Sequence, residues 1–595
     1  MKSPLKLLIP IIFFILIGRL FQLQVLKTDY YKLLSEKDRL RREVISAPRG
    51  KIFSREGNIL AESRPSYSLM IDPYQVDSTE ISRLSRVLDM KEEAIYKKVK
   101  PHFRISCIRR VSFEEVSRII EEQELFPSIR VITEPVRYYP YDSILSHLLG
   151  YTGEISDEEL KSYKVIYRKG DIVGKKGVEK SFEHYLRGKK GVTFVEVDVR
   201  GRVVRRFDGS KAKLSERGND IYLTISKNLT LYADSLLNNF PCAASVAMDP
   251  RTGEILLYYS KPGYPTNKMT AGIPVCEWDS LRCREDAPLW DRIISGEYPP
   301  GSIFKISTAI IALENKVIDE FKEFEPCKES LYIGDRYFGC WKKHEKLKLT
   351  DAIIQSCDIF FYQVGMSMTL EEMIEYARNL RFGERCGIDL PGEGEGFLPS
   401  RDWYNEKYGR RGWGRGVLAN LAIGQGEILI TPIQLVTFFS SIANSGWTYT
   451  PHIVREIKDK NGNNVRMSNP DKIALPISST TINIIREAME RVVNDRKGTA
   501  YWSRLKDIKV AGKTGTAENP QGEDHSLFVG FAPFEQPKIV VFTIVENSGH
   551  GSAYAAPITT KIIKRYLENE KSRSEGFEVS IQDYGLEENS KISRD

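Results

Sequence analysis

The sequence has little cysteine and histidine, and it has no long block of basic residues. Its 595 residues include 8 cysteines and 7 histidines, and its 87 basic residues are balanced by 80 acidic ones. So few cysteines do not make a disulfide scaffold in a chain of this length. No Lys/Arg run with interleaved aromatic residues occurs, so we expect no nucleic-acid partner. The length predicts more than one domain.

Long apolar runs are also missing, apart from one near the start. Lys2 and Lys6 precede the apolar residues 7–23, a run of about 17 residues that is near the lower limit for a membrane-spanning helix. No small-residue cleavage site follows, so we expect an uncleaved anchor. The lysines predict residues 1–6 in the cytoplasm, one span through the cell inner membrane at residues 7–23, and a periplasmic or extracytoplasmic body.

Residues 24–241 predict a mixed, elongated α+β module without strong catalytic chemistry. Strand-like alternation occurs at residues 67–72 and 193–199, whereas residues 91–100 and 113–122 are amphipathic and favour helices.

Residues 242–567 have a different pattern, which predicts a second domain. A Pro/Gly turn between residues 243–248 and 254–260 indicates a β-hairpin, and a helix is expected from Ser302 to Leu313. Late strands are expected at residues 507–511, 527–532 and 538–546. The polar residues 568–595 are expected to form a loosely attached tail.

A serine and a lysine three residues apart open the predicted helix. Ser302 and Lys305 follow a Pro-Pro-Gly turn, and residues i and i+3 share one face of a helix. A desolvated lysine can take the proton of a serine hydroxyl, so Ser302 is a candidate nucleophile and Lys305 its base. This pair alone is weak evidence, because an exposed serine and lysine on a helix are common. No Ser-His-Asp triad with a G-x-S-x-G elbow is visible.

Two further motifs follow in the order expected of penicillin-recognising enzymes. The sequence Ser356-Cys357-Asp358 lies about fifty residues after Ser302, and a lysine motif, residues 513–516, lies about 210 residues after it. A second serine can relay a proton to a leaving amine. A cationic lysine beside two threonines can bind a carboxylate, and a glycine between them allows close approach of the substrate.

With these three motifs in order, the chain resembles the class B penicillin-binding proteins from Arg42 to about Leu567. The further matching segments are Ala47-Pro48-Arg49-Gly50, His147, Leu149-Gly150-Tyr151, Gly170-Asp171-Ile172-Val173-Gly174-Lys175, Arg292, Ile423-Gly424-Gln425-Gly426 and Gly498-Thr499-Ala500.

The resemblance implies a multidomain α/β fold. An N-terminal membrane helix is followed by a pedestal (dimerisation-like) domain at residues 24–241. A penicillin-binding/β-lactamase-like transpeptidase domain, with a central antiparallel sheet flanked by helices, follows at residues 242–567. The nucleophile would attack the penultimate D-alanine of a peptidoglycan stem peptide, release the terminal D-alanine and pass the acyl group to a neighbouring amine. β-Lactam antibiotics would trap the acyl-enzyme, and catalysis would need no cofactor.

The resemblance also assigns roles to the motif residues. The expected catalytic residues are the nucleophile Ser302, the general base Lys305, the proton relay Ser356, its orienting partner Asp358 and the carboxylate-binding Lys513. The expected substrate-binding residues are Thr514, Gly515 and Thr516. Backbone amides of Ser302 and Thr516 would supply the oxyanion hole. Asp358 stands where many of these enzymes have asparagine.

Three cysteines and a histidine suggest the subfamily. Cys327, Cys340, His344 and Cys357, with residues 525–531, resemble the elongation-type enzyme, which maintains cell shape. Three thiolates and an imidazole are a tetrahedral zinc set in kind, so a structural Zn²⁺ is expected. The alternatives are buried or oxidised cysteines with a surface histidine, and in particular a disulfide between Cys327 and Cys340.

Residues 24–241 match a pedestal and leave no room for a glycosyltransferase domain. The resemblance therefore implies a polytopic membrane glycosyltransferase of the elongation machinery as partner. Other functions remain open, including a carboxypeptidase side activity or main activity, a β-lactamase, a β-lactam sensor and a non-catalytic scaffold of the elongation machinery.

Overall fold

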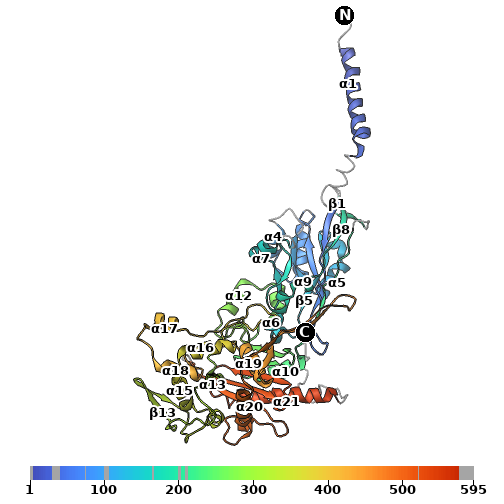
Figure 1. Ribbon diagram of the computed structural model, residues 1–595. Helices are drawn as coiled ribbons and strands as arrows, with labels where there is room; N and C mark the ends of the chain where they lie inside the picture. The colour runs from blue at the N-terminus through green and yellow to red at the C-terminus, as the bar shows by residue number, and fades with distance from the viewer. Residues whose placement is uncertain are drawn as a thin grey trace. The chain divides into compact units, whose positions relative to one another are not determined.

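The computed structural model describes residues 5–29, 40–73, 75–99, 106–163, 167–197, 203–207, 212–519 and 522–574. The chain forms two compact units (Figure 1). The first comprises Met1–Gly50, Glu62–Arg137 and His184–Asn219, and the second comprises Lys51–Ala61, Tyr138–Glu183 and Asp220–Asp595.

The predicted anchor lies on helix α1 (Leu5–Phe21), which a short π-helical segment (Gln22–Leu26) follows. Within the described residues, no helix combines the length and the apolar character needed to cross a membrane.

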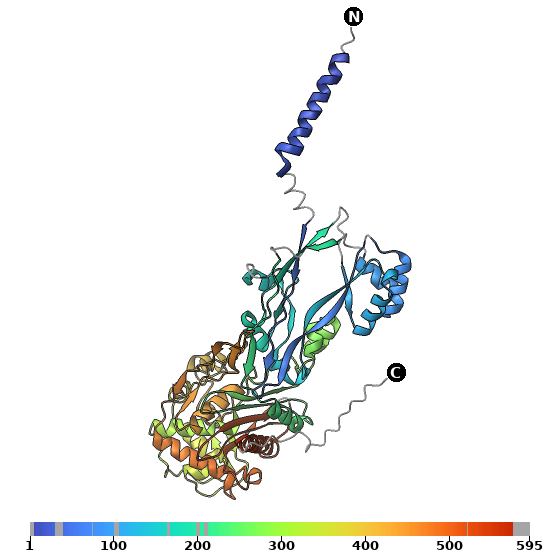
Figure 2. The ribbon, with the colours of Figure 1, turned by 90° about the vertical axis from the view of Figure 1, so that its right-hand side faces the viewer.

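The first unit is built around a long strand, β3 (Ile59–Ile71), whose later part pairs with β4 (Ser106–Val111). Helices α3 (Ser78–Leu88), α4 (Glu92–Val99) and α5 (Phe113–Glu121) lie beside these strands (Figure 2). Their apolar faces bury a core that includes Leu69, Ile81, Leu84, Ile108, Val116 and Ile119. The amphipathic spacing that predicted α4 and α5 is therefore confirmed, because the apolar positions share one helix face.

A second sheet of the first unit joins β1 (Leu40–Ile45), β8 (Gly191–Val197) and β9 (Val203–Phe207) in antiparallel order. The strands predicted at residues 67–72 and 193–199 correspond to β3 and β8, although residues 198 and 199 lie outside the described residues, as does residue 100 of the first predicted helix.

The second unit contains a five-stranded antiparallel sheet in the order β12-β11-β21-β20-β19. Its members are β11 (Ala243–Met248), β12 (Ile255–Lys261), β19 (Ala511–Ala517), β20 (His525–Ala532) and β21 (Ile539–Val545). Every residue of β11 and β21 is buried, so both faces of the sheet are covered. The helices that pack on it include α10 (Lys227–Leu237), α19 (Pro432–Ala443), α20 (Ser479–Asn494) and α21 (Ala555–Ser574) (Figure 1).

The predicted hairpin at residues 243–260 and the strands at 527–532 and 538–546 are confirmed. The strand predicted at residues 507–511 is wrong: β19 begins at Ala511 and continues to Ala517. Glycine has a low strand propensity, so Gly512 and Gly515 weaken the sequence signal for β19. Pairing with β20 supplies the stabilisation, so the lysine motif lies within an edge strand.

Two other boundaries differ from the predictions. The residues before Lys305 form a short 3₁₀ turn, Gly301–Ile303, and helix α13 spans Lys305–Glu314. At the other end of the unit, α21 continues to Ser574, so residues 568–574 of the predicted tail are helical. The rest of that tail, residues 575–595, lies outside the described residues.

Candidate active site

Ser302 lies on the 3₁₀ turn immediately before α13, and it is half-buried. Gly301 has a φ of 53°, and a side chain at this position would meet the Thr516 carbonyl oxygen at 2.3 Å. Its amide donates to the Gly424 carbonyl at 2.9 Å. Only glycine fits this turn, which therefore holds Ser302 close to the edge strand β19.

Lys305 is fully buried at the start of α13. Its Nζ donates to the Ser356 carbonyl at 2.9 Å, to Ser356 Oγ at 3.2 Å and to Asp358 Oδ1 at 2.7 Å. The contact with Asp358 is an ion pair whose carboxylate side chain is 17% exposed. A buried lysine requires such partners, because an isolated ammonium is costly in an apolar environment.

Lys513 reaches the same serine from β19. It is also fully buried, and its Nζ donates to Ser356 Oγ at 2.9 Å and to the Thr514 carbonyl at 2.9 Å. Both lone pairs of Ser356 Oγ are then engaged by lysines, which leaves the hydroxyl proton free to be donated. Ser356 has a φ of 51°, a strained backbone conformation of the kind found at functional sites.

The charges of this cluster are unequal, since one carboxylate faces two lysines. Burial lowers the pKa of Lys513 well below the ordinary lysine value, and the neighbouring Lys305 adds to this effect. Burial raises the pKa of Asp358, although Lys305 opposes the shift. These shifts favour a neutral amine on Lys513, whereas Lys305 is the lysine that pairs directly with the carboxylate.

Strand β19 carries the residues expected to bind substrate. Thr514 Oγ1 lies 2.7 Å from Thr499 Oγ1, and Gln425 Nε2 donates to the Thr516 carbonyl at 3.2 Å. A side chain at Gly515 would meet Ile303 at 2.8 Å, so this glycine lets the strand pack against the nucleophile turn. Lys513, Thr514 and Thr516 therefore all lie on the edge strand, where each is paired with a residue of β20.

Two family models match the chain along most of its length. The "Penicillin binding protein transpeptidase domain" matches residues 243–564, and the "Penicillin-binding Protein dimerisation domain" matches residues 44–223. The chain belongs to the penicillin-binding proteins. The predicted family is therefore confirmed.

Several proteins similar to this penicillin-binding protein are PBP2 enzymes. The Peptidoglycan D,D-transpeptidase MrdA of Acinetobacter baumannii is 33% identical over 92% of this chain and 84% of the relative. The complex between penicillin-binding protein PBP2 and MreC from Helicobacter pylori contains a similar chain, with a TM-score of 0.78, 26% identity, and coverage of 89% of this chain and 99% of that one.

A further structure, described as "Structural coordination of polymerization and crosslinking by a peptidoglycan synthase complex", has a TM-score of 0.69 and 27% identity. It covers 97% of this chain and 99% of that one. Together these similarities confirm the class B, PBP2-type classification and the two-domain fold.

In this penicillin-binding protein, the structure brings together Lys305, Ser356, Asp358 and Lys513 as the motifs predicted. The Ser302 hydroxyl makes no hydrogen bond within the described residues, so it is not yet linked to Lys305. Sequence reasoning gave no role to Thr499 and Gln425. Both lie in segments that matched the family, and this was the available signal for them.

A polar network supports the segment that leads to Ser302. Tyr298 Oη donates to Glu546 Oε1 at 2.6 Å, and Arg292 Nε donates to the same oxygen at 2.8 Å. Arg292 is 2% exposed. The ring of His525, at the start of β20, contacts Tyr298 edge-on with centroids 5.9 Å apart. This network attaches the turn to β20 and β21, and sequence analysis did not identify Glu546.

The predicted zinc ligands form a second cluster beside the first. Potential ligand atoms of Cys327, Cys340, His344 and Cys357 all lie within 4.8 Å of one another. His344 Nδ1 is 3.4 Å from Cys327 Sγ and 3.7 Å from Cys340 Sγ. The three cysteines are free thiols in the structure, so the alternative disulfide between Cys327 and Cys340 is not formed. His344 is 4% exposed, which is at odds with the alternative of a surface histidine.

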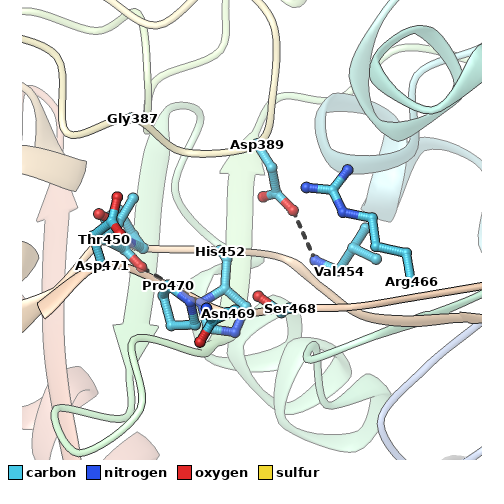
Figure 3. A pocket seen from close by; sticks show the side chains of 11 residues that line it. Gly387, Asp389, Thr450, His452, Val454, Arg466, Ser468, Asn469, Pro470 and Asp471 are labelled. Carbon is cyan, nitrogen blue, oxygen red and sulfur yellow. Dashed lines mark hydrogen bonds between the residues drawn. The ribbon is translucent and has the colours of Figure 1, made fainter.

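A pocket elsewhere in the second unit is lined by none of the predicted catalytic residues (Figure 3). It holds about 170 Å³, and Asp389 and His452 lie in its wall. The Asp389 carboxylate accepts the backbone amides of Ile453 and Val454 at 2.7 and 3.0 Å. The Asp389 carboxylate therefore stabilises the backbone at Ile453 and Val454. We assign no chemistry to this pocket.

Proposed function

We propose that this chain is a peptidoglycan D,D-transpeptidase that cross-links stem peptides during cell elongation through an acyl-enzyme on Ser302. The observation that carries the proposal is the pair of buried lysines, Lys305 and Lys513, that both donate to Ser356 Oγ. The name of the Acinetobacter relative supports this reaction.

We infer the first half of the reaction from these contacts. Lys513, Thr514 and Thr516 hold the substrate carboxylate at the edge of β19. Ser302 Oγ attacks the carbonyl of the penultimate D-alanine and transfers its proton to the amine of Lys305, the proposed general base. The backbone amides of Ser302 and Thr516 stabilise the oxyanion. The C–N bond to the terminal D-alanine then breaks, and Ser356 passes a proton from the lysine to the leaving amine.

The second half reverses these proton movements. An amine from a neighbouring stem attacks the acyl-enzyme, gives up a proton through Ser356 to Lys305, and forms the cross-link as Ser302 leaves. Water in place of the amine gives a carboxypeptidase side activity. A β-lactam ring opens on Ser302 in the same way, and its ring-opened product stays attached. Asp358 orients Lys305 throughout, through their ion pair.

Intact-protein mass spectrometry of the full-length chain with a fluorescent penicillin tests the nucleophile. We expect one adduct on the wild type, none on Ser302→Ala, and one on the control Ser367→Ala, which removes a hydroxyl outside the site. Lack of an adduct on folded wild type would overturn the proposal in favour of a non-catalytic scaffold.

A second assay separates a transpeptidase from a carboxypeptidase and a β-lactam sensor. A stem pentapeptide is incubated with an amine acceptor, and the released D-alanine and the cross-linked product are measured. Cross-linked product supports the transpeptidase. Hydrolysis alone would support the carboxypeptidase, and acylation by penicillin without either product would support the sensor.

We also propose that Cys327, Cys340, His344 and Cys357 hold a structural zinc ion. Zn–S bonds of about 2.3 Å and Zn–N bonds of about 2.0 Å give a tetrahedral S···N separation of about 3.5 Å. The observed 3.4 and 3.7 Å fit this value. The ion would tie residues 327–344 to the turn that carries Ser356, and it would supply no step of the reaction. Metal analysis of the purified chain tests this, and a value far below one zinc per chain would contradict it.

The cellular setting is a further part of the proposal. Residues 7–23 would anchor the chain in the inner membrane, with residues 1–6 in the cytoplasm and the catalytic domain outside it. The apolar side chains of α1 support this anchor, since those of Ile11–Ile17 are exposed. A polytopic membrane glycosyltransferase of the elongation machinery would be the partner, and the synthase complex that couples polymerization to crosslinking supports this choice. The PBP2–MreC complex supports a partner within the same machinery. Membrane fractionation and co-purification test both points.

A further inference from the structure

A cavity of about 380 Å³ lies in the second unit, and none of the proposed catalytic or zinc-binding residues lines it. Its wall comes from three segments that are distant in sequence: residues 175–180, 289–295 and 390–392, with His147 beside them. A volume of this size suits a small ligand. The polar groups that line the cavity determine which ligand it would recognise.

The cationic groups of the cavity are incompletely paired. Lys175 forms an ion pair with Glu159 at 2.5 Å. Lys176, in contrast, donates to the Leu289 carbonyl at 3.0 Å and has no ion pair among the described residues. Lys180 is exposed at the cavity and likewise lacks an ion pair there. An ammonium has three donors, and although Lys176 Nζ also lies 5.9 Å from the centroid of the Tyr264 ring, it can still donate to a ligand.

The burial of Lys176 makes this state costly without a ligand. Burial lowers the pKa of Lys176 below the ordinary lysine value, and Lys180 lowers it further, while Asp291 opposes the shift. The Asp291 carboxylate is already engaged by the Tyr258 hydroxyl and the Ile293 amide at 3.0 Å. Among the described residues, Asp291 is thus the one counter-charge that acts on Lys176, and an anion between Lys176 and Lys180 would add a second one.

The remaining groups suit a hydroxylated ring. His147 Nε2 lies 3.0 Å from the Pro262 carbonyl oxygen, so this nitrogen carries the proton and donates. His147 Nδ1 is then an acceptor without a hydrogen-bond partner within the described residues. Trp290 is 37% exposed at the cavity. The Arg292 guanidinium lies 5.4 Å from the centroid of its ring, and the exposed part of the ring offers an apolar surface. An aromatic face beside hydrogen-bonding groups can pack against a sugar ring while these groups bind its hydroxyls.

We propose that this cavity is a binding site for an anionic saccharide, a sugar ring that carries a carboxylate or a phosphate. Lys176 and Lys180 bind the oxyanion, Trp290 packs against the ring, and His147 Nδ1 accepts a hydroxyl of the ring. This site is separate from the Ser302 centre and does not depend on the function proposed for it.

Calorimetric titration of the full-length chain with three probes tests the proposal. The probes are glucuronate, glucose 1-phosphate and glucose. We expect the two anions to bind at least about tenfold more tightly than glucose, since hydrogen bonds to a charged group contribute about 1.5–3 kcal/mol. Tighter binding of glucuronate would identify a carboxylated source, and tighter binding of glucose 1-phosphate a phosphorylated one. Binding of glucose equal to both anions, or no binding of any probe, would overturn the proposal.

Variants locate the binding. Lys176→Met should weaken anion binding at least about tenfold, whereas Lys268→Met, which removes an exposed lysine elsewhere, should not. Lys513→Met is the decisive comparison, because Lys513 is the other carboxylate-binding candidate. Loss of binding in Lys513→Met with retention in Lys176→Met would overturn the cavity as the site. Unchanged thermal midpoints and penicillin labelling of Lys176→Met would exclude a folding defect.

A separate variant tests the proposed packing of the sugar ring against Trp290. Trp290→Leu should reduce glucose 1-phosphate binding severalfold and leave the binding of inorganic phosphate unchanged. Equal effects on both probes would overturn the role of the ring. Raising the salt concentration from about 0.1 M to about 1 M shortens the screening length from about 10 Å to about 3 Å, so anion binding should weaken. Binding that is insensitive to salt would contradict recognition by Lys176 and Lys180.

Discussion

The turn Ser356-Cys357-Asp358 takes part in two clusters that are built differently. Ser356 and Asp358 contact two buried lysines. Cys357 belongs to the cluster of three thiols and one imidazole. The lysine cluster has an unequal charge balance, which allows a proton to move. The sulfur cluster brings four donor atoms within 4.8 Å of one another, and the proposed zinc ion would fix the backbone there.

The comparison suggests that the two clusters have different roles at residues 356–358, one in the chemistry and one in stability. Ser356 has a φ of 51°, and such a strained residue persists only where its surroundings over-determine it. The lysine cluster holds the side chain of Ser356, whereas the sulfur cluster holds the next residue. If this division is correct, changes on the lysine side alter chemistry, and changes on the sulfur side alter stability first.

The largest expected effect is that of Lys305→Met. This variant keeps most of the side-chain volume and removes the proposed general base, so penicillin acylation should slow by about a thousandfold. Stopped-flow labelling with a fluorescent penicillin measures the rate. The control Lys316→Met removes an exposed lysine just beyond the same helix. A rate within about threefold of wild type would contradict a base at this position.

Lys513→Met should slow acylation by about a hundredfold and stabilise the fold. Since the pKa of Lys513 is lowered in the folded state, the unfolded chain binds more protons between that lowered pKa and the ordinary value of about 10.4. Wild-type stability should therefore rise with pH across this window. Denaturant titrations at several pH values should give a smaller slope for Lys513→Met. An unchanged slope would refute the assignment of this effect to Lys513.

The sequence predicted elements whose pattern is local. The hairpin of β11 and β12 has a Pro/Gly turn, and α5 has regular apolar spacing, so both were found. Strand β19 was expected about four residues too early, because its central residues include two glycines and its stability comes from pairing with β20. Such pairing is a tertiary effect that a local window does not contain.

The distinction between local and tertiary signals also explains which residues of the candidate site the sequence predicted. Ser302, Lys305, Ser356 and Lys513 lie in short motifs, so they could be found without a structure. Glu546 contacts Tyr298 across 248 residues, and no motif marks it. The sequence did not predict the cavity at Lys176 either, because three segments that are distant in sequence form it.

Cys340→Ser tests the sulfur side of the turn. Loss of one ligand should lower the thermal midpoint by several degrees, equivalent to about 2 kcal/mol or more, and slow acylation about tenfold through displacement of Ser356. Differential scanning fluorimetry and penicillin labelling measure the two effects. Cys276→Ser, which changes an exposed free cysteine, should do neither. A large rate effect without a change in midpoint would reverse the proposed division between the clusters.

Thr499→Val should have the smallest effect. This change removes the hydrogen bond of 2.7 Å to Thr514 but keeps the shape of the side chain. A neutral hydrogen bond contributes about 1 kcal/mol, so we expect acylation to slow about fivefold with an unchanged thermal midpoint. The rate should fall at low penicillin concentration and recover at saturation, because Thr514 is proposed to bind the carboxylate and not to move protons. A defect that persists at saturation would instead link Thr499 to the proton-transfer side of the site.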